Sequence, residues 1–404
     1  MAGKNAPQAK AKPDAKAGRG SGAAGGRAVP MSRVAEGISR SLGEPAWLLR
    51  KRLEAVALLE KRNGRAEVSG KFAKGRLAVD AKIKGSAAVL TIQQALSGGN
   101  ALEEQFGKPF SGHEPDNCLI SFALFTEAAV VAADSGKPAE IALELSGKPP
   151  EHFATFFVFA DHSEATVLVK RNFAQDGNEC SCAVVGKGAN VQFCSVRDDA
   201  PKTDSAIGMC ASLGEGAALK LLNSNIGGSL RDEQVLILQN ERGSRCEHYE
   251  ASISYGSQKI TKSSDHLHVA PDTFSRSVFK YATAGNSQVR VDGKVTIEKS
   301  APGSDTHLLA KSLLLSDRAI SHVVPQLYVR NAQVMAGHGS AMTPLDKEEL
   351  FYLQSRGIGE NESKLMVLQG FLQEIIAKSE IAQWLAAGVE AELSRAAGEL
   401  YRGE

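Results

Sequence analysis

The middle of this 404-residue chain, from His152 to about Thr343, contains recurring short strand patterns and no long amphipathic helical pattern. Val, Ile, Leu and Phe dominate these segments, and turns rich in Gly, Asn and Asp separate them. A doubly wound sheet requires crossover helices, so this region excludes that fold class. The residues alone leave a sandwich, a barrel or a parallel β-helix open. The strand segments are 153–160, 165–173, 189–196, 217–226, 232–240, 288–299 and 307–317.

The charge balance and the apolar runs indicate which partners and which cellular compartment to expect. With 47 Lys and Arg against 46 Asp and Glu, the formal charge of +1 suggests neither nucleic acid nor a membrane surface as the partner. The longest apolar run, Leu119 to Ala133, is interrupted by Thr126 and Glu127 and is too short to cross a bilayer. The amino terminus has no apolar leader pattern. We therefore expect a soluble, cytoplasmic protein.

Composition divides the chain into four regions. Residues 1–30 are basic and rich in Ala, Gly and Pro, which predicts a disordered tail, and the G-x-G-x-x-G within it has neither a preceding strand nor a following helix. Residues 31–150 are predicted to form an amino-terminal region of helical and mixed structure. Residues 151–343 form the predicted β core, and residues 344–404 a predicted carboxy-terminal helical domain.

The sequence lacks the common catalytic motifs. No Gly-x-x-x-x-Gly-Lys-Ser/Thr occurs, so we expect no intrinsic ATP site, and His-Glu-x-x-His, Cys-x-x-Cys and Gly-x-Ser-x-Gly are also absent. A carbohydrate-active β-helix enzyme would need paired carboxylates, for which Asp232 with Glu233, or Glu247 with Glu250, are poor candidates. These absences favour a non-catalytic protein.

Two pairs of potential metal ligands lie two residues apart in extended segments. His266 and His268 point to one side of a strand, as do Cys180 and Cys182. The favoured interpretation is hydrogen-bonded histidines and small buried thiols, because neither pair has a second pair at a fixed spacing. All six cysteines have irregular spacings in a long chain, which indicates free thiols in a reducing compartment.

Motifs along the chain resemble the SufB/SufD family, scaffold components of the SUF iron-sulfur cluster assembly machine. Glu44-Pro45-x-Trp47 followed by Arg52 resembles the amino-terminal signature of that family. The core motifs that carry the resemblance are His268 with Ser275, Arg276 and Lys280; Gly293 with Leu313, Leu314 and Leu315; and Pro325-x-Leu327 followed by Gly337-His338-Gly339. The resemblance implies a mainly β protein with a right-handed parallel β-helix core between helical regions.

The glycine-flanked His338 makes the chain more similar to SufD than to SufB. Ala310 stands where SufB proteins carry a cysteine, and Ala336 stands where SufD proteins often carry one. The resemblance therefore makes His338 the candidate ligand for iron or a transient iron-sulfur cluster at a partner interface, with His268 as a weaker candidate. The alternative for His338 is a structural one, in which it caps the last coil. A flavin in the complex is left open.

The carboxy-terminal helices carry more apolar surface than one end of a β-helix can cover. In the family this tail docks the ABC-type ATPase SufC, and the candidate contact residues here are Phe351, Tyr352, Arg356 and Phe371. Packing of these residues within the chain is the alternative. The resemblance implies a SufD-like, non-catalytic subunit that pairs with a SufB-like subunit. A homodimeric scaffold that binds the cluster itself, and more remotely the carbohydrate-active enzyme, are the alternatives.

Overall fold

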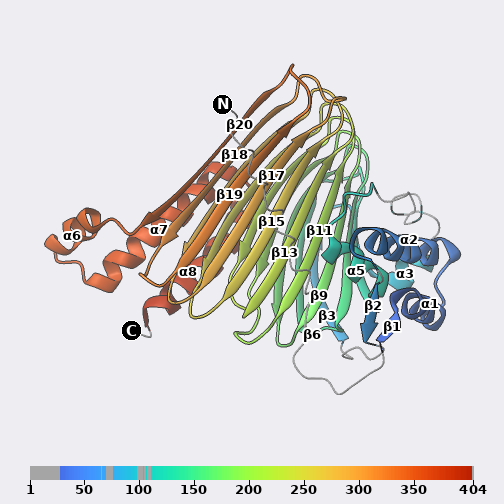
Figure 1. The fold of residues 1–404 in the computed structure, drawn as a ribbon, viewed down its shortest axis with the longest axis horizontal. Coiled ribbons are helices and arrows are strands. Elements are labelled where there is room, and N and C mark those ends of the chain that lie inside the picture. Colours follow the sequence, from blue (N-terminus) through green and yellow to red (C-terminus); the bar gives the residue numbers. More distant parts are fainter. Residues whose placement is uncertain are drawn as a thin grey trace, which may run out of the picture.

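The computed structural model describes residues 28–64, 66–69, 76–97, 103, 106 and 111–402. Two nine-stranded sheets face each other along one elongated solenoid, and helices pack against the outer faces of both sheets (Figure 1). Successive strands alternate between the sheets, so each turn adds one strand to each. This is a parallel β-helix flanked by helical segments, which confirms the predicted fold class. Residues 1–27 of the predicted tail lie outside the described residues.

The order of strands is the same in both sheets. From one edge to the other, the first sheet contains β20 (Met335–Pro344), β18 (Asp305–Leu314), β16 (Phe274–Thr283), β14 (Arg245–Ser254), β12 (Ala218–Asn225), β10 (Asn190–Arg197), β8 (Glu164–Phe173), β6 (Ala139–Lys148) and β3 (Arg76–Lys84). The second contains β19 (Ile320–Val329), β17 (Gln288–Ile297), β15 (Lys259–His268), β13 (Leu230–Gln239), β11 (Ser205–Leu213), β9 (Gly177–Val185), β7 (His152–Phe159), β5 (Glu127–Ala133) and β4 (Ala87–Thr91).

The outermost strands at the amino-terminal end, β3 and β4, pair antiparallel, and the pairings from β5 and β6 onward are parallel and in register. The parallel strands thus begin before residue 151, where the sequence placed the start of the core. Strand β5 is short and mostly apolar, and β6 alternates buried and more exposed residues. The sequence alone does not separate either strand from the mixed region before them.

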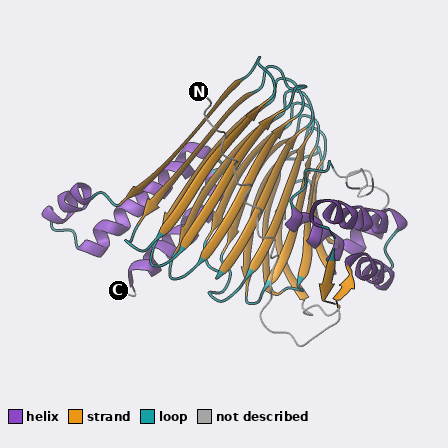
Figure 2. Cartoon of the chain, in the orientation of Figure 1, coloured by secondary structure: helices purple, strands orange, loops and turns teal. Residues whose placement is uncertain are grey.

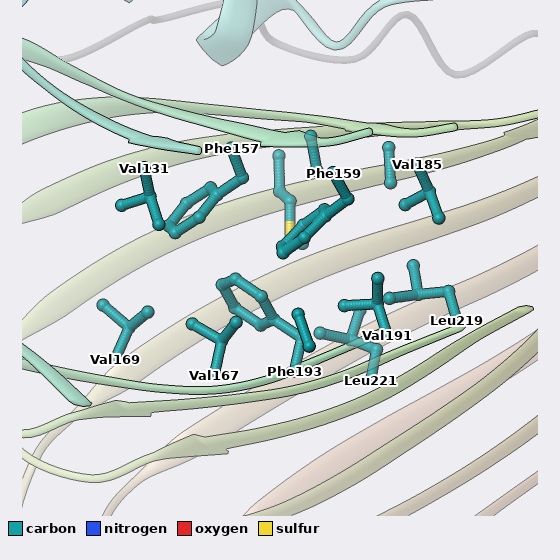
Figure 3. Packing of buried hydrophobic residues seen from close by; sticks show 14 of the residues in the cluster. Val131, Phe157, Phe159, Val167, Val169, Val185, Val191, Phe193, Leu219 and Leu221 are labelled. Carbon is teal, nitrogen blue, oxygen red and sulfur yellow. The ribbon is translucent and has the colours of Figure 1, made fainter. Parts of the chain in front are cut away.

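Apolar side chains from the two sheets meet inside the amino-terminal half of the solenoid. In β6, buried Ile141, Leu143 and Leu145 alternate with more exposed residues, as expected for a strand with one inward face. Phe157 of the second sheet and Phe193 of the first meet edge to face with ring centroids 4.8 Å apart (Figure 3). Stacked turns therefore share one continuous core.

Helices cover the outer face of the second sheet near its amino-terminal end. These are α1 (Met31–Leu42), α2 (Ala46–Asn63), α3 (Ile92–Ser97) and α5 (Asp116–Leu124), and a two-stranded ribbon of β1 (Ala28–Pro30) and β2 (Glu67–Ser69) lies beside them (Figures 1 and 2). Helix α5 contacts β7, β9, β11 and β13 directly. It links α1 and α2 to the solenoid, whereas α3 contacts β4 and β5 directly.

The Glu44 to Arg52 signature has a structural role in this helical region. The guanidinium of Arg52 donates to the carbonyl oxygens of Phe122, Ala123 and Phe125 at 3.2, 2.9 and 3.0 Å, where α5 ends. It also pairs with the Glu44 carboxylate, with Nε 2.8 Å from Oε2. Arg52 therefore satisfies carbonyl groups that a helix end leaves without partners, and it joins α2 to α5.

The carboxy-terminal helices are α6 (Lys347–Ser355), α7 (Glu360–Ser379) and α8 (Gln383–Arg402). Helices α7 and α8 pack against the outer face of the first sheet, on β8, β10, β12, β14 and β16. The buried amine of Lys280 on β16 donates to the carbonyl oxygen of Phe371 at 2.6 Å and pairs with Glu374. Helix α6 projects away from the solenoid (Figure 1) and contains no buried residue. None of the described helices is long and apolar enough to cross a membrane.

Candidate functional site

His338 lies on β20, at the carboxy-terminal edge of the first sheet. Its register partner is Leu308, which is buried in the solenoid, so His338 belongs to an inward-facing column of residues. No described strand covers β20 or β19 on their outer sides, and His338 is exposed in consequence. The imidazole therefore stands at the open end of the interior. His307 and His322, on β18 and β19, are also exposed.

His268 occupies a different environment, inside the solenoid. Its Nδ1 lies 2.7 Å from Thr273 Oγ1 and its Nε2 2.9 Å from Ser275 Oγ, so both ring nitrogens have hydroxyl partners. Burial lowers the pKa of His268 to about 4. The seven-residue spacing from His268 to Ser275 thus corresponds to a hydrogen bond between β15 and the next strand, β16. This arrangement leaves neither nitrogen free for a ligand.

His266 points into the interior beside His268, as the two-residue spacing predicted, but the two rings have separate partners. His266 Nε2 lies 3.3 Å from His248 Nδ1 and 3.1 Å from Ser277 Oγ. Burial lowers the pKa of His266 to about 3. Burial also lowers the pKa of His248 well below its usual value, and the neighbouring Lys262 and His266 act in the same direction. These imidazoles are neutral, hydrogen-bonded parts of the interior.

An ion-pair network crosses the same interior. Glu179 accepts hydrogen bonds from Arg171 and Arg197, with Arg197 Nη1 2.9 Å from Oε2. Burial raises the pKa of Glu179, but the two guanidinium groups more than offset this and hold it below its ordinary value. Four basic and four acidic side chains balance in the network, which contains two neighbouring groups of ion pairs. One group is Arg171, Arg197 and Arg231 with Glu179 and Asp199, and the other is Lys262 with Glu233 and Glu250. All eight are buried.

This network bears on the carbohydrate-enzyme alternative. Glu233 and Glu250 both pair with the buried amine of Lys262, with Glu233 Oε1 2.9 Å from Nζ. These carboxylates lie inside the solenoid, away from the surface that a polysaccharide would contact. They therefore hold strands β13, β14 and β15 together.

The four predicted partner-contact residues divide into two groups. Phe351 and Tyr352 on α6 are 72% and 57% exposed, and they line a shallow surface groove with Lys347, Glu348 and Ser355. Arg356 follows α6 and donates to the Tyr352 hydroxyl at 3.1 Å. Phe371 is half-buried, with the Lys280 amine 4.5 Å from its ring centroid. The structure thus exposes the first three and packs Phe371 between α7 and β16.

Three thiols meet where α5 crosses the outer face of the second sheet. Cys118 Sγ lies 3.0 Å from Cys180 Sγ and 3.8 Å from Cys182 Sγ, and the last two are 3.4 Å apart. The sequence indicated that Cys180 and Cys182 share a face, but it gave no reason to place Cys118 with them. A helix packed on the strand brings Cys118 there, and spacing along the chain carries no signal for such a contact.

The structure is thus a parallel β-helix with uncovered strands at its carboxy-terminal edge and with helices packed against the outer faces of both sheets. A sequence model described as "SUF system FeS cluster assembly, SufBD core domain" matches residues 148–371. The chain belongs to this family. The resemblance seen in the sequence is therefore confirmed, and the matched residues include most of the solenoid and His338.

Individual relatives agree with this assignment. A protein of Mycobacterium tuberculosis named as an iron-sulfur cluster assembly SufBD family protein is 38% identical over 140 residues, which are 32% of this chain and 35% of the relative. A Mycobacterium leprae protein of the same description is 36% identical over 141 residues, or 32% of this chain and 36% of the relative. The chain thus spans about a third of the length of these curated relatives.

Proposed function

We propose that this chain is a SufD-like scaffold subunit of an iron-sulfur cluster assembly complex, and that its open solenoid end pairs with a SufB-like subunit. The observation that carries this proposal is the uncovered pair of edge strands, β19 and β20. Edge strands present unpaired backbone donors and acceptors, which proteins normally cover or block. Exposed apolar side chains also lie along this edge, namely Val324, Tyr328, Val329, Met335 and Met342.

The cargo of this complex would be iron, sulfide or the assembled cluster, and His338 is the group we propose as its ligand. The neutral imidazole is a common metal ligand, and His338 lies on the inward face at the open end. Ala310 and Ala336 provide no thiolate there, so further ligands would come from the partner. Nothing in the geometry of the described residues supports a flavin, so the proposal contains none.

Helix α6 is the proposed contact for a SufC-like ATPase. Its aromatic pair, Phe351 and Tyr352, projects into solvent from a helix without a buried residue. Exposing two adjacent aromatic rings to water is unfavourable, whereas such rings commonly anchor a protein interface. Phe371 would act differently, by holding α7 on β16. ATP-driven closure of two SufC subunits would then pull on α6 and α7 and move the β-helix ends. The chain itself would perform no chemistry.

Co-expression with SufB and SufC homologues from the same genome tests these contacts. A double Phe351→Ala, Tyr352→Ala variant should lose SufC but keep the SufB-like partner, whereas the matched pair Leu230→Ala, Ile83→Ala on exposed strand positions should keep both. Assembly of the wild-type chain with neither homologue would contradict the proposal. A homodimer that holds iron and sulfide alone would favour the self-sufficient scaffold instead.

His338 is tested separately by the iron and sulfide content of the complex after anaerobic purification. His338→Ala should lower that content without changing the mass of the complex. His322→Ala is the matched control, because His322 is exposed on the neighbouring edge strand β19. Equal iron content in all three proteins would show that His338 only completes the last turn.

A further inference from the structure

The thiols of Cys118, Cys180 and Cys182 form a sulfur-only cluster away from the open end of the solenoid. Cys180 and Cys182 are two residues apart on β9, so both side chains leave the outer face, opposite to Ala183 and Val185 in the core. Cys118 comes from the first turn of α5. All three are free and buried, and they are the one group of three or more potential metal ligands within the described residues.

A fourth thiol lies beside this cluster. Cys210 on β11 is the register partner of Cys182, and its thiol interacts with that of Cys118. No histidine nitrogen or carboxylate oxygen belongs to the group. Thiolate-only sites select soft or borderline cations such as copper(I) and zinc, and disfavour magnesium and calcium.

The spacing of the sulfur atoms is close to that of a bound ion. With metal to sulfur distances of about 2.3 Å, tetrahedral geometry places two sulfurs about 3.8 Å apart. The measured separations of 3.0, 3.4 and 3.8 Å require two of the three pairs to open by less than an ångström. Side-chain rotation and a small shift of α5 would supply that.

Charged groups beside the cluster would compensate bound thiolates in part. The amine of Lys51 on α2 is nearly buried and acts electrostatically on Cys182, while Arg62 of the same helix acts on Cys210. Glu114 acts in the opposite direction on both cysteines. Hydrogen bonds from Cys180 and Cys182 lower the pKa of Cys118, but Cys210 and burial outweigh them and raise it to about 11. The metal-free thiols are therefore protonated, and a bound ion must displace those protons.

We propose that Cys118, Cys180 and Cys182 bind one thiophilic metal ion of the zinc or copper(I) class, which clamps helix α5 to strand β9. Such an ion would hold α1 and α2 on the solenoid, because both pack against α5. Cys210 is positioned to become the fourth ligand in a four-coordinate site. This inference does not depend on the proposed assembly function, since it concerns the opposite end of the solenoid.

Metal titration of the full-length reduced chain under anaerobic conditions tests the site. Zinc is titrated in competition with a chromophoric chelator, cobalt(II) serves as a spectroscopic probe, and copper(I) is titrated in parallel. We expect binding of one ion per chain. Cobalt should give thiolate charge-transfer absorption, and binding should raise the unfolding temperature. Binding of zinc and cobalt indicates a four-coordinate site, whereas binding of copper(I) alone indicates a three-coordinate one.

Substitutions then locate the ion. Cys180→Ser and Cys182→Ser should lose binding, while Cys194→Ser and Cys246→Ser, which change buried thiols elsewhere, should retain it. In case a variant fails to fold, alkylation of the wild-type chain in partly denaturing conditions provides a second readout. Added metal should slow the modification of Cys118, Cys180 and Cys182 and leave the rate at Cys194, which is buried elsewhere, unchanged. The proposal is overturned if no probe binds stoichiometrically, or if the Cys180→Ser and Cys246→Ser variants bind equally.

Discussion

At the scale of single residues, Gly208 determines how closely α5 can approach the solenoid. A Cβ atom at this position on β11 would overlap the backbone nitrogen and Cα of Cys118. Those are backbone atoms, so the helix itself would have to move. Gly208 therefore permits the contact that brings Cys118 to Cys180.

Gly208→Ala should displace α5 and destabilise the protein by roughly 1–3 kcal/mol, the usual cost of overpacking. Chemical denaturation measures this change in the free energy of unfolding. Gly370→Ala is the matched control, because a Cβ on that residue of α7 meets nothing within 4 Å and alanine favours a helix. If both variants unfold at the wild-type denaturant concentration, α5 does not pack as described.

The buried histidines predict a dependence of stability on pH. Burial lowers the pKa of His266 to about 3, below its unfolded value near 6.5, so the unfolded chain binds the extra proton between these two values. This residue therefore contributes stability that is present above pH 6.5 and is lost as the pH falls toward 3. The loss amounts to about 1.4 kcal/mol for each pH unit below 6.5. His152 and His268, each with a pKa lowered by burial to about 4, act in the same direction.

His266→Gln should remove its share of that dependence. Between pH 7.5 and 5.5 its free energy of unfolding should fall by about 1.4 kcal/mol less than that of the wild type. Comparing the slopes of stability against pH for the variant and the wild type isolates the contribution of the His266 imidazole. Carboxyl groups such as Glu250, whose pKa burial raises, change the stability in the opposite direction in both proteins. The exposed His307→Gln control should keep the wild-type slope. A His266→Gln slope equal to that of the wild type would mean that His266 is not buried as described.

At the scale of elements, Arg52 makes five hydrogen bonds, three of which connect α2 to α5. Three go to carbonyl groups at the end of α5 and two to the buried Glu44 carboxylate. Arg52→Met should cost roughly 3–5 kcal/mol, because it leaves a buried charge without its partner. Arg50→Met on the same helix should cost less than about 0.5 kcal/mol, since Arg50 is exposed. Equal denaturation midpoints for the two variants would contradict this role.

The elements also show which parts of the sequence are informative. Strand β8 is visible in the sequence because most of its inward residues are hydrophobic. Strand β13 is visible because Val235, Leu236 and Ile237 form an apolar run, although its inward residues also include Arg231 and Glu233. Strands β14 and β15 carry inward histidine, glutamate, lysine and serine, and this hides the alternation that identifies a strand. Residues 117–133 look like one apolar segment, but helix α5 and strand β5 share it. Periodicity cannot separate such short runs.

At the scale of the whole molecule, the β-helix could be predicted only by joining two arguments. The absence of crossover helices excluded a doubly wound sheet, and the family motifs then selected the β-helix. The thiol cluster could not be predicted, because Cys118 and Cys180 are distant in sequence and meet through the packing of α5. The exposure of His338 likewise depends on its being in the last strand, which its local motif does not reveal.

Pairing of the open end of the solenoid with a SufB-like subunit is tested by amide hydrogen exchange. The free chain should be compared with the same chain after mixing with a SufB homologue from the same genome. We expect new protection in β19 and β20, with unchanged exchange in β3 and β4 at the opposite end. Protection confined to the amino-terminal end, or a stable complex without protection of β19 and β20, would contradict it.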